Sequence, residues 1–198
     1  MSSKNRKQKV VNLFGGPGAG KSTMAAALFA ELKFSGINCE LVPEYAKEQE
    51  WEGRTGKIRQ AQDYIFAKQH FRLSRLIGEV DVIITDAPLM LSQIYTPKDY
   101  LPSLSSVVLE AHRRFDNLNL FVQRVEAYQE FGRSQTYDQA IELDKKIHEM
   151  LSDMHFVGGV HDGITTSTEY GAHKVLDLAN RIKQWISTGE SSQFTRGL

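Results

Sequence analysis

The sequence has almost no cysteine and no excess of charge of either sign. Cys39 is the single cysteine among 198 residues, which excludes an internal disulfide framework and a CxxC metal pair. Its place in the apolar run 37–42 predicts a small buried core residue and a reducing, cytoplasmic setting. Lys and Arg number 24, as do Asp and Glu. This balance argues against a protein that coats nucleic acid by bulk charge, but it leaves room for a local basic groove.

Long hydrophobic runs are missing as well. No apolar stretch approaches the roughly 20 residues that a membrane-spanning helix needs, so no membrane association is expected. Residues 1–9 are polar and basic, and we predict no secretory signal there. Internal repeats and linkers are also lacking. We therefore expect one domain over residues 1–198, with frayed ends at 1–7 and 188–198.

Short apolar segments alternate with longer amphipathic ones along the chain. Strands are predicted at 10–14, 38–42, 80–85, 118–122 and 156–160. Helices are predicted at 21–33, 45–51, 58–77, 104–115, 137–150 and 168–186. Such alternation is typical of a parallel sheet with helices on both faces, which is the α/β class.

The most specific motif lies between the first strand and the first helix. Residues 15–22 match the pattern G-x-x-x-x-G-K-[ST]. Glycines there let several backbone N–H groups point at one anion, and the helix start adds its positive dipole end. Lys21 would reach the β- and γ-phosphates, and Ser22 would offer a hydroxyl to Mg²⁺. The predicted nucleotide-binding residues are Gly15, Gly16, Pro17, Gly18, Ala19, Gly20, Lys21, Ser22 and Thr23.

A phosphate loop serves kinases, motor or switch ATPases and GTPases alike. The guanine-reading pattern N-K-x-D is absent, which is weak evidence for ATP over GTP as the donor. The strand at 80–85 ends in the single acid Asp86, followed by Ala87 and Pro88, whereas AAA-type motors are usually larger and carry paired acids there. These features favour a small kinase that uses ATP and Mg²⁺.

Two acids follow predicted strands and so fall at the carboxyl edge of the sheet. Asp86 could hold Mg²⁺ through water or take the proton of an acceptor hydroxyl, and the alternative is a turn or helix-capping aspartate. Glu44 follows the second strand and could orient or deprotonate the acceptor, and the alternative is a solvated surface glutamate. Ser22 and Asp86 are the predicted metal ligands.

Two arginines could bring positive charge to the transferring phosphate. Arg124 follows the fourth strand, and Arg133 lies in a polar loop within residues 125–137 that could act as a lid. A simple connecting loop with a solvated arginine is the alternative.

The acceptor side is less sharply marked. Aromatic and basic residues gather around one loop and could stack a base, or equally form an ordinary surface: Trp51, Arg54, Lys57 and Arg59. Polar residues of the following long helix should in part face the cleft: Gln62, Tyr64, Lys68, Gln69 and Arg72.

With the phosphate loop, Glu-Tyr-Ala-Lys at 44–47 and Thr-Asp-Ala-Pro-Leu at 85–89 in view, residues 8–185 resemble a known group. They resemble the bacteriophage small P-loop kinases related to the nicotinamide riboside kinase domain, and among these the 5-hydroxymethyluracil DNA kinases. That resemblance implies phosphorylation of the base hydroxymethyl group within DNA, toward hypermodified thymidine. It also implies nucleotide binding by Gly15 to Thr23, catalytic acids at Asp86 and Glu44, and a lid arginine at Arg133.

The sequence thus predicts a three-layer α/β/α P-loop kinase with a five-stranded parallel sheet. The main hypothesis is in-line transfer of the γ-phosphoryl from ATP to a hydroxyl, assisted by Lys21, Arg133 and Arg124. The acceptor would be 5-hydroxymethyluracil in DNA. One alternative is a kinase of a free nucleoside, nucleotide or ribosyl cofactor, and another is an ATP-hydrolysing switch or accessory protein.

Overall fold

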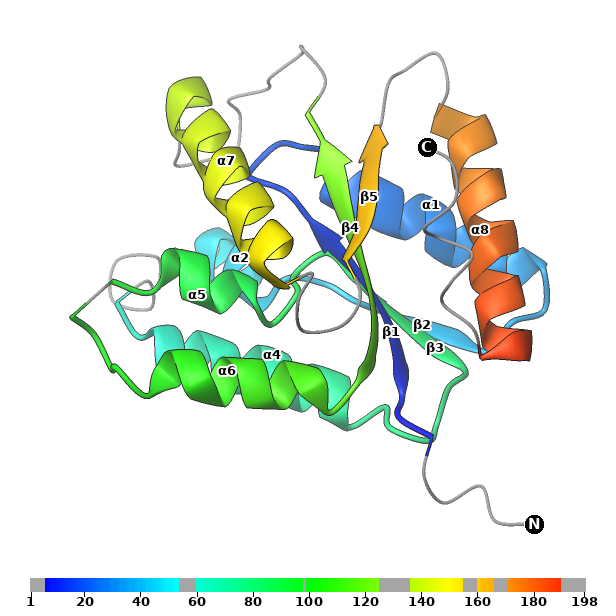
Figure 1. Cartoon of the computed structure of the whole chain (residues 1–198), viewed down its shortest axis with the longest axis horizontal. Coiled ribbons are helices and arrows are strands. Elements are labelled where there is room, and N and C mark those ends of the chain that lie inside the picture. Colours follow the sequence, from blue (N-terminus) through cyan, green and yellow to red (C-terminus); the bar gives the residue numbers. More distant parts are fainter. Residues whose placement is uncertain are drawn as a thin grey trace.

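A parallel sheet with β1 at its centre organises the molecule, shown in Figure 1 as a computed structural model. The structure describes residues 6–53, 60–97, 99–124, 136–154, 160–165 and 171–189, without the side chains of 154, 160–165 and 171–173. The strands are β1 (Lys9–Phe14), β2 (Cys39–Val42), β3 (Val82–Thr85), β4 (Asp116–Gln123) and β5 (Val160–Thr165), in the order β2-β3-β1-β4-β5. Every neighbouring pair is parallel.

Helices cover both faces of this sheet, as Figure 1 shows. One face carries α1 (Lys21–Phe34) and α8 (Gly171–Thr188). The other carries α4 (Gln62–Ser74), α5 (Leu91–Tyr95), α6 (Leu104–Arg113) and α7 (Tyr137–Met154). The short α2 (Tyr45–Trp51) packs on α4. The predicted α/β class is therefore confirmed.

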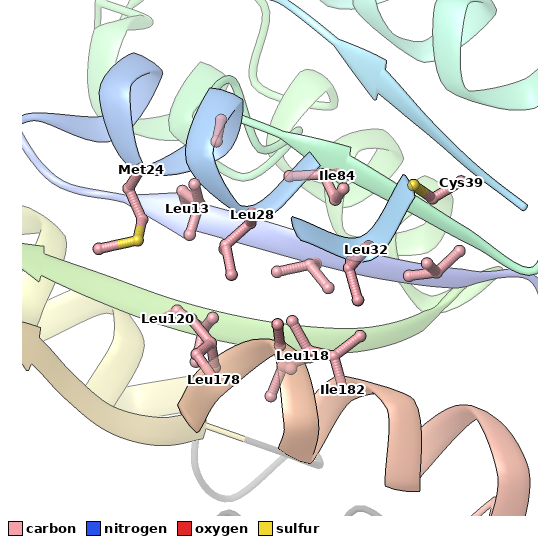
Figure 2. Close-up of a cluster of buried hydrophobic side chains, with 14 of the residues drawn as sticks. Leu13, Met24, Leu28, Leu32, Cys39, Ile84, Leu118, Leu120, Leu178 and Ile182 are labelled. Carbon is pink, nitrogen blue, oxygen red and sulfur yellow. The ribbon is translucent and has the colours of Figure 1, made fainter. Parts of the chain in front are cut away.

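Two hydrophobic cores result, one on each face, because alternate residues of a buried strand point to opposite sides. Val11 and Leu13 of β1 belong to the core under α1 and α8. Figure 2 shows this core, in which Leu28 of α1 extends over the sheet beside Leu13 of β1. Val10 and Phe14 of β1 belong to the core under α4 to α7. Burial on both faces explains why the central strands read as continuous apolar runs.

Four strands lie within two residues of their predicted bounds, whereas the fifth strand continues to Thr165, beyond the predicted end at residue 160. The apolar residues at 156–160 suggested a strand there, but β5 begins at Val160 and residues 156–159 lie outside the described residues. β5 pairs with β4 with a register shift between Leu120 and Val122. Residues 161–165 contain no continuous apolar run, so the sequence pattern did not indicate that the strand extends this far.

The helix predictions were correct in kind and less so in their bounds. The long helix predicted at 58–77 is observed as α4, which ends at Ser74 and is followed by turns up to Glu79. The five-residue helix α5 was not predicted. Within the described residues, no helix combines the length and the apolar character that crossing a bilayer requires.

The parallel order brings the carboxyl ends of neighbouring strands to one edge of the sheet. Residues 15–20 follow β1, Glu44 follows β2 after Pro43, Asp86 follows β3 and Arg124 follows β4. Crevices at this edge are where open α/β sheets bind ligands.

Candidate active site

The phosphate loop leaves β1 through a backbone shape that only glycine adopts readily. Gly15, Gly18 and Gly20 have φ values of 143°, 80° and 95°. At Gly15 a Cβ atom would also lie 2.9 Å from the carbonyl oxygen of Val122. α1 starts at Lys21, and within the described chain no side chain caps its first turn. Its N–H groups and dipole are therefore open to an anion.

Lys21 is folded over the loop that precedes it. Its Nζ donates to the carbonyl oxygens of Gly15 at 2.7 Å and Gly16 at 3.0 Å. Burial lowers the pKa of Lys21, and the carboxylates of Glu44, Asp86 and Asp144 oppose that shift. A phosphate in the loop would offer this ammonium stronger, charged acceptors than the two carbonyls.

Glu44 and Asp86 lie near Lys21, as their strand-end positions predicted. Glu44 is the N-cap residue of α2 and is half-buried. Burial raises the pKa of Glu44, the Asp86 carboxylate raises it further, and the Lys21 ammonium lowers it. A carboxyl group with a raised pKa is a stronger base once it is ionised.

Asp86 is the acid best suited to hold a metal. The residue is 4% exposed, and its Oδ1 is buried without a hydrogen-bond partner among the residues that the structure describes. Buried polar atoms are normally satisfied, so an unused carboxylate oxygen beside a phosphate loop fits a hydrated Mg²⁺. The described residues contain no group of three or more His, Cys, Asp or Glu that could hold a metal. This is compatible with Mg²⁺, which takes most of its ligands from water and phosphate.

A pocket of about 550 Å³ joins the phosphate loop to α2, α4 and α5. On the loop side it is lined by Pro17, Gly18, Gly20, Lys21, Ser22 and Thr23. Glu44 stands next to them, at the start of α2. The phosphate-binding elements and the candidate base therefore share one cavity.

The far wall of the pocket is aromatic and amide-rich. It comprises Tyr45, Lys47, Glu50 and Trp51 of α2, Gln62, Ile65 and Gln69 of α4, and Leu91, Ser92 and Tyr95 of α5. Trp51 is 72% exposed and lies at the rim. Arg54, Lys57 and Arg59, predicted to accompany it, lie outside the described residues.

α2 is fixed to α4 by polar contacts that the long-helix residues provide. Gln69 accepts the Tyr45 N–H at 3.1 Å, and the Tyr45 and Tyr64 hydroxyls are 3.1 Å apart. Arg72 forms a two-pronged ion pair with Glu48, and its guanidinium lies 4.9 Å from the centre of the Tyr45 ring. Five polar residues of this helix were predicted in part to face the cleft. Of these, Gln62 and Gln69 line the pocket, while Tyr64 and Arg72 contact α2. Lys68 lies over the Tyr64 ring, 5.4 Å from its centre.

Of the two arginines predicted to act on the transferring phosphate, the structure describes Arg124 but not Arg133. The Nε of Arg124 pairs with Asp144 of α7 at 2.9 Å, so this side chain lies against the phosphate loop near Gly16 and not in the pocket wall. Arg133 falls in 125–135, outside the described residues, so its role as a lid arginine stays a prediction. Asp144 was missed, although an acid in the apolar stripe of a helix is a signal for a buried partner.

The comparisons with known proteins agree with this geometry. A family model described as an AAA domain (AAA_28) matches residues 10–158, well over half of the chain. No curated protein matches the sequence. Among solved structures, the NadR protein in complex with NR is similar over 91% of this chain, with a TM-score of 0.66 and 17% identity. The chain spans about half of that protein, 52% of its length.

Two further structures are more distantly similar. Shikimate kinase from Acinetobacter baumannii in complex with shikimate has a TM-score of 0.49 and 15% identity, over 93% of this chain and 96% of that one. APS kinase CysC from Mycobacterium tuberculosis in complex with AMPPNP and APS has a TM-score of 0.47 and 11% identity, over 93% and 100%. The family match shows that the chain is an AAA domain, and the likeness to the NadR protein shows that the two share an α/β fold.

Proposed function

The chain belongs to the AAA_28 family of AAA domains, and we propose that it is an ATP- and Mg²⁺-dependent phosphotransferase that phosphorylates a hydroxyl group. The proposed acceptor is the 5-hydroxymethyl group of 5-hydroxymethyluracil in DNA. The observation that carries the proposal is the single pocket in which Lys21, Ser22 and Glu44 face the aromatic wall of α2 and α5. A switch ATPase has no need for such a wall next to its phosphate site.

The loop side would bind the triphosphate. N–H groups of the first turn of α1 would hold the phosphate oxygens, and Lys21 would leave the Gly15 and Gly16 carbonyls for the β- and γ-phosphates. Ser22 and Asp86 would hold Mg²⁺, with Asp86 acting through water from its buried Oδ1. Bound there, Mg²⁺ would neutralise charge that develops on the phosphate oxygens.

Glu44 is the better placed of the two acids to receive the acceptor proton. It lines the pocket, and the pKa raised by burial makes it a stronger base than an exposed glutamate. A primary alcohol has a pKa far above 7, so in a loose transition state the positioning of the hydroxyl matters more than its deprotonation. Glu44 would do both by accepting a hydrogen bond from the attacking hydroxyl.

The acceptor wall suits a planar heterocycle. Trp51 and Tyr95 line the pocket with aromatic side chains on which a base could stack. Trp51 is largely exposed at the rim, beside the exposed Lys47. An aromatic and a cation at the mouth of the pocket favour a base presented from a polymer, since a small acceptor held inside would not need them.

A kinase of a free nucleoside, nucleotide or ribosyl cofactor is the second candidate. Its support is the likeness to the NadR protein, which was crystallised with NR, and a pocket volume that a free nucleoside would also fit. The two candidates share the loop, the metal ligands and Glu44, and they differ only in what approaches the rim.

Transfer of labelled γ-phosphate from ATP, or from GTP in a parallel series, tests the proposal. The acceptors are DNA with 5-hydroxymethyluracil, matched unmodified DNA with free 5′-hydroxyls, and a panel of nucleosides, nucleotides and ribosyl cofactors. We expect label on the modified DNA alone. Label on a free nucleoside would replace the DNA assignment with the second candidate, and release of phosphate without transfer would refute both.

Two variants, Lys21→Ala and Trp51→Ala, separate the role of the phosphate loop from that of the acceptor wall. Lys21→Ala should abolish transfer to every acceptor, while Lys33→Ala, at the far end of the same helix, should not. Trp51→Ala should reduce transfer to DNA about 10-fold through the loss of one base stack. It should spare any ATP hydrolysis that occurs without acceptor.

A further inference from the structure

One carboxylate that does not line the pocket, that of Asp144 in α7, contacts the phosphate loop at Gly16. The face of α7 toward the sheet carries Ala140, Ile147 and Leu151, all buried. Asp144 falls in the same stripe, four residues after Ala140 and three before Ile147, and its side chain is only 16% exposed. A charge in this position is costly unless it is paired and hydrogen-bonded.

Both oxygens of Asp144 are used. Oδ2 pairs with the Nε of Arg124 at 2.9 Å, and the Arg124 side chain is 7% exposed. Oδ1 accepts a hydrogen bond from the backbone N–H of Gly16. A Cβ atom at Gly16 would lie 2.7 Å from Asp144 Oδ1 and 2.8 Å from the carbonyl oxygen of Ala140. The loop, the end of β4 and α7 therefore meet in direct contact at Gly16.

The N–H that Asp144 binds belongs to the same peptide group as the carbonyl that Lys21 binds. Gly15 C=O and Gly16 N–H are the two ends of one planar unit. Lys21 Nζ contacts its oxygen at 2.7 Å, and Asp144 contacts its N–H. When Lys21 turns to the phosphates, the contact at the oxygen is lost and the contact with Asp144 can remain.

We propose that Asp144 is a positioning residue that holds the Gly15–Gly16 peptide in the orientation the phosphate loop needs for nucleotide. Arg124 keeps the Asp144 carboxylate aimed at Gly16 and neutralises its charge. The proposal rests on the nucleotide-binding part of the proposed function and is independent of the acceptor. It also gives Arg124 a role through the loop, distinct from contact with the transferring phosphate.

Two double variants isolate the contact with Gly16. Asp144→Asn with Arg124→Met keeps an oxygen that can accept the Gly16 N–H, and Asp144→Ala with Arg124→Met removes it. Both lack the arginine and the carboxylate charge, so neither leaves a buried ion unpaired, which favours folding. We expect the Ala/Met variant to bind magnesium AMPPNP, a non-hydrolysable ATP analogue, about 3- to 10-fold more weakly than the Asn/Met variant.

Dissociation constants should be measured by calorimetry below the melting temperature of both variants, together with hydrogen exchange at the loop amides. Faster exchange at Gly16 in the Ala/Met variant is expected. Glu142→Gln, an exposed acid on the same helix, is the control and should bind like the wild type. Equal dissociation constants for the two double variants would overturn the proposal even if their melting temperatures differ. A wild-type protein that does not bind magnesium AMPPNP would instead refute the proposed function.

Discussion

At the scale of single residues, the raised pKa of Glu44 is expected to make it a stronger base and to lower the stability of the folded protein when Glu44 is ionised. Burial raises its pKa, so the folded state binds a proton more tightly than the unfolded state does. Stability is therefore lost as the pH rises through the interval between the unfolded and the folded pKa, and the full penalty applies above the folded pKa. An ionised Glu44 is also the form that can act as a base.

Glu44→Gln should separate these two effects. We expect phosphate transfer to fall about 100-fold, at the low end of the range of general base catalysis, because positioning contributes more than deprotonation here. The melting temperature at pH 7 should rise by about 2 °C or more, and this gain should vanish in acid, where Glu44 is protonated in both states. Scanning calorimetry from pH 4 to 8 checks the second outcome, and a melting temperature that is lower at pH 7 would contradict it.

Asp86 is expected to act through the metal. Asp86→Asn keeps the shape of the side chain but removes the negative charge of the carboxylate that includes the buried Oδ1. The Mg²⁺ concentration for half-maximal transfer should rise about 10-fold or more, whereas the affinity for nucleotide without metal should change little. Asp81→Asn, an exposed aspartate before the same strand, is the control. An unchanged Mg²⁺ requirement would remove Asp86 from the metal site.

At the scale of elements, the acceptor wall depends on how α2 is held. Arg72 of α4 pairs with Glu48 and lies over the Tyr45 ring, so it sets where Glu44 and Trp51 stand. Arg72→Met should raise the KM for the acceptor about 3- to 10-fold and leave nucleotide affinity unchanged, because Arg72 contacts Pro43, Glu48 and Tyr45, which lie outside the phosphate loop. The loss of stability should stay near or below about 1 kcal/mol, as for other partly exposed pairs.

Arg75→Met provides the comparison, since Arg75 is exposed at the end of the same helix. Steady-state kinetics with acceptor and nucleotide varied in turn distinguish the two substrates. An equal rise in both KM values for Arg72→Met would show that the two walls of the pocket are not independent.

The helices and strands differ in how well their positions could be predicted from the sequence. β1 to β4, α1 and α2 could be predicted because their signals are local: apolar runs, helical spacing and glycine at the breaks. The same is true of the phosphate loop, Asp86 and Glu44, whose places follow from the order of strands. The extent of β5 could not be predicted, because its sequence, Val-His-Asp-Gly-Ile-Thr, contains no continuous apolar run.

Asp144 shows what such patterns leave out. Its contact with Gly16 spans 128 residues of sequence, and its pairing with Arg124 depends on α7 packing beside β4. Periodicity places an acid in an apolar stripe but does not name its partner. Likewise, the packing of α2 on α4 decides that Gln62 and Gln69, and not Lys68, line the pocket.

At the scale of the whole molecule, the phosphate loop directly follows β1, the strand that lies between the two cores. β1 buries side chains on both faces, and α1, which carries Lys21, contributes Met24, Leu28 and Leu32 to one core. Nucleotide that binds only the folded state should therefore stabilise the molecule by mass action. At 100 times the dissociation constant the gain is about 2.7 kcal/mol. For a chain of this size that is roughly 5 to 10 °C in melting temperature.

Two variants test whether the rise in melting temperature on nucleotide binding depends on the phosphate loop or on the hydrophobic core. Lys21→Ala should abolish the shift caused by magnesium AMPPNP without lowering the melting temperature of the free protein, because burial of the ammonium is itself unfavourable. Leu28→Ala, in the core of Figure 2, should cost about 2 to 5 kcal/mol but keep the shift, since the loop would be unchanged. If Leu28→Ala folded and yet lost the shift, the loop would depend on the packing of α1 and not only on its own glycines and Asp144.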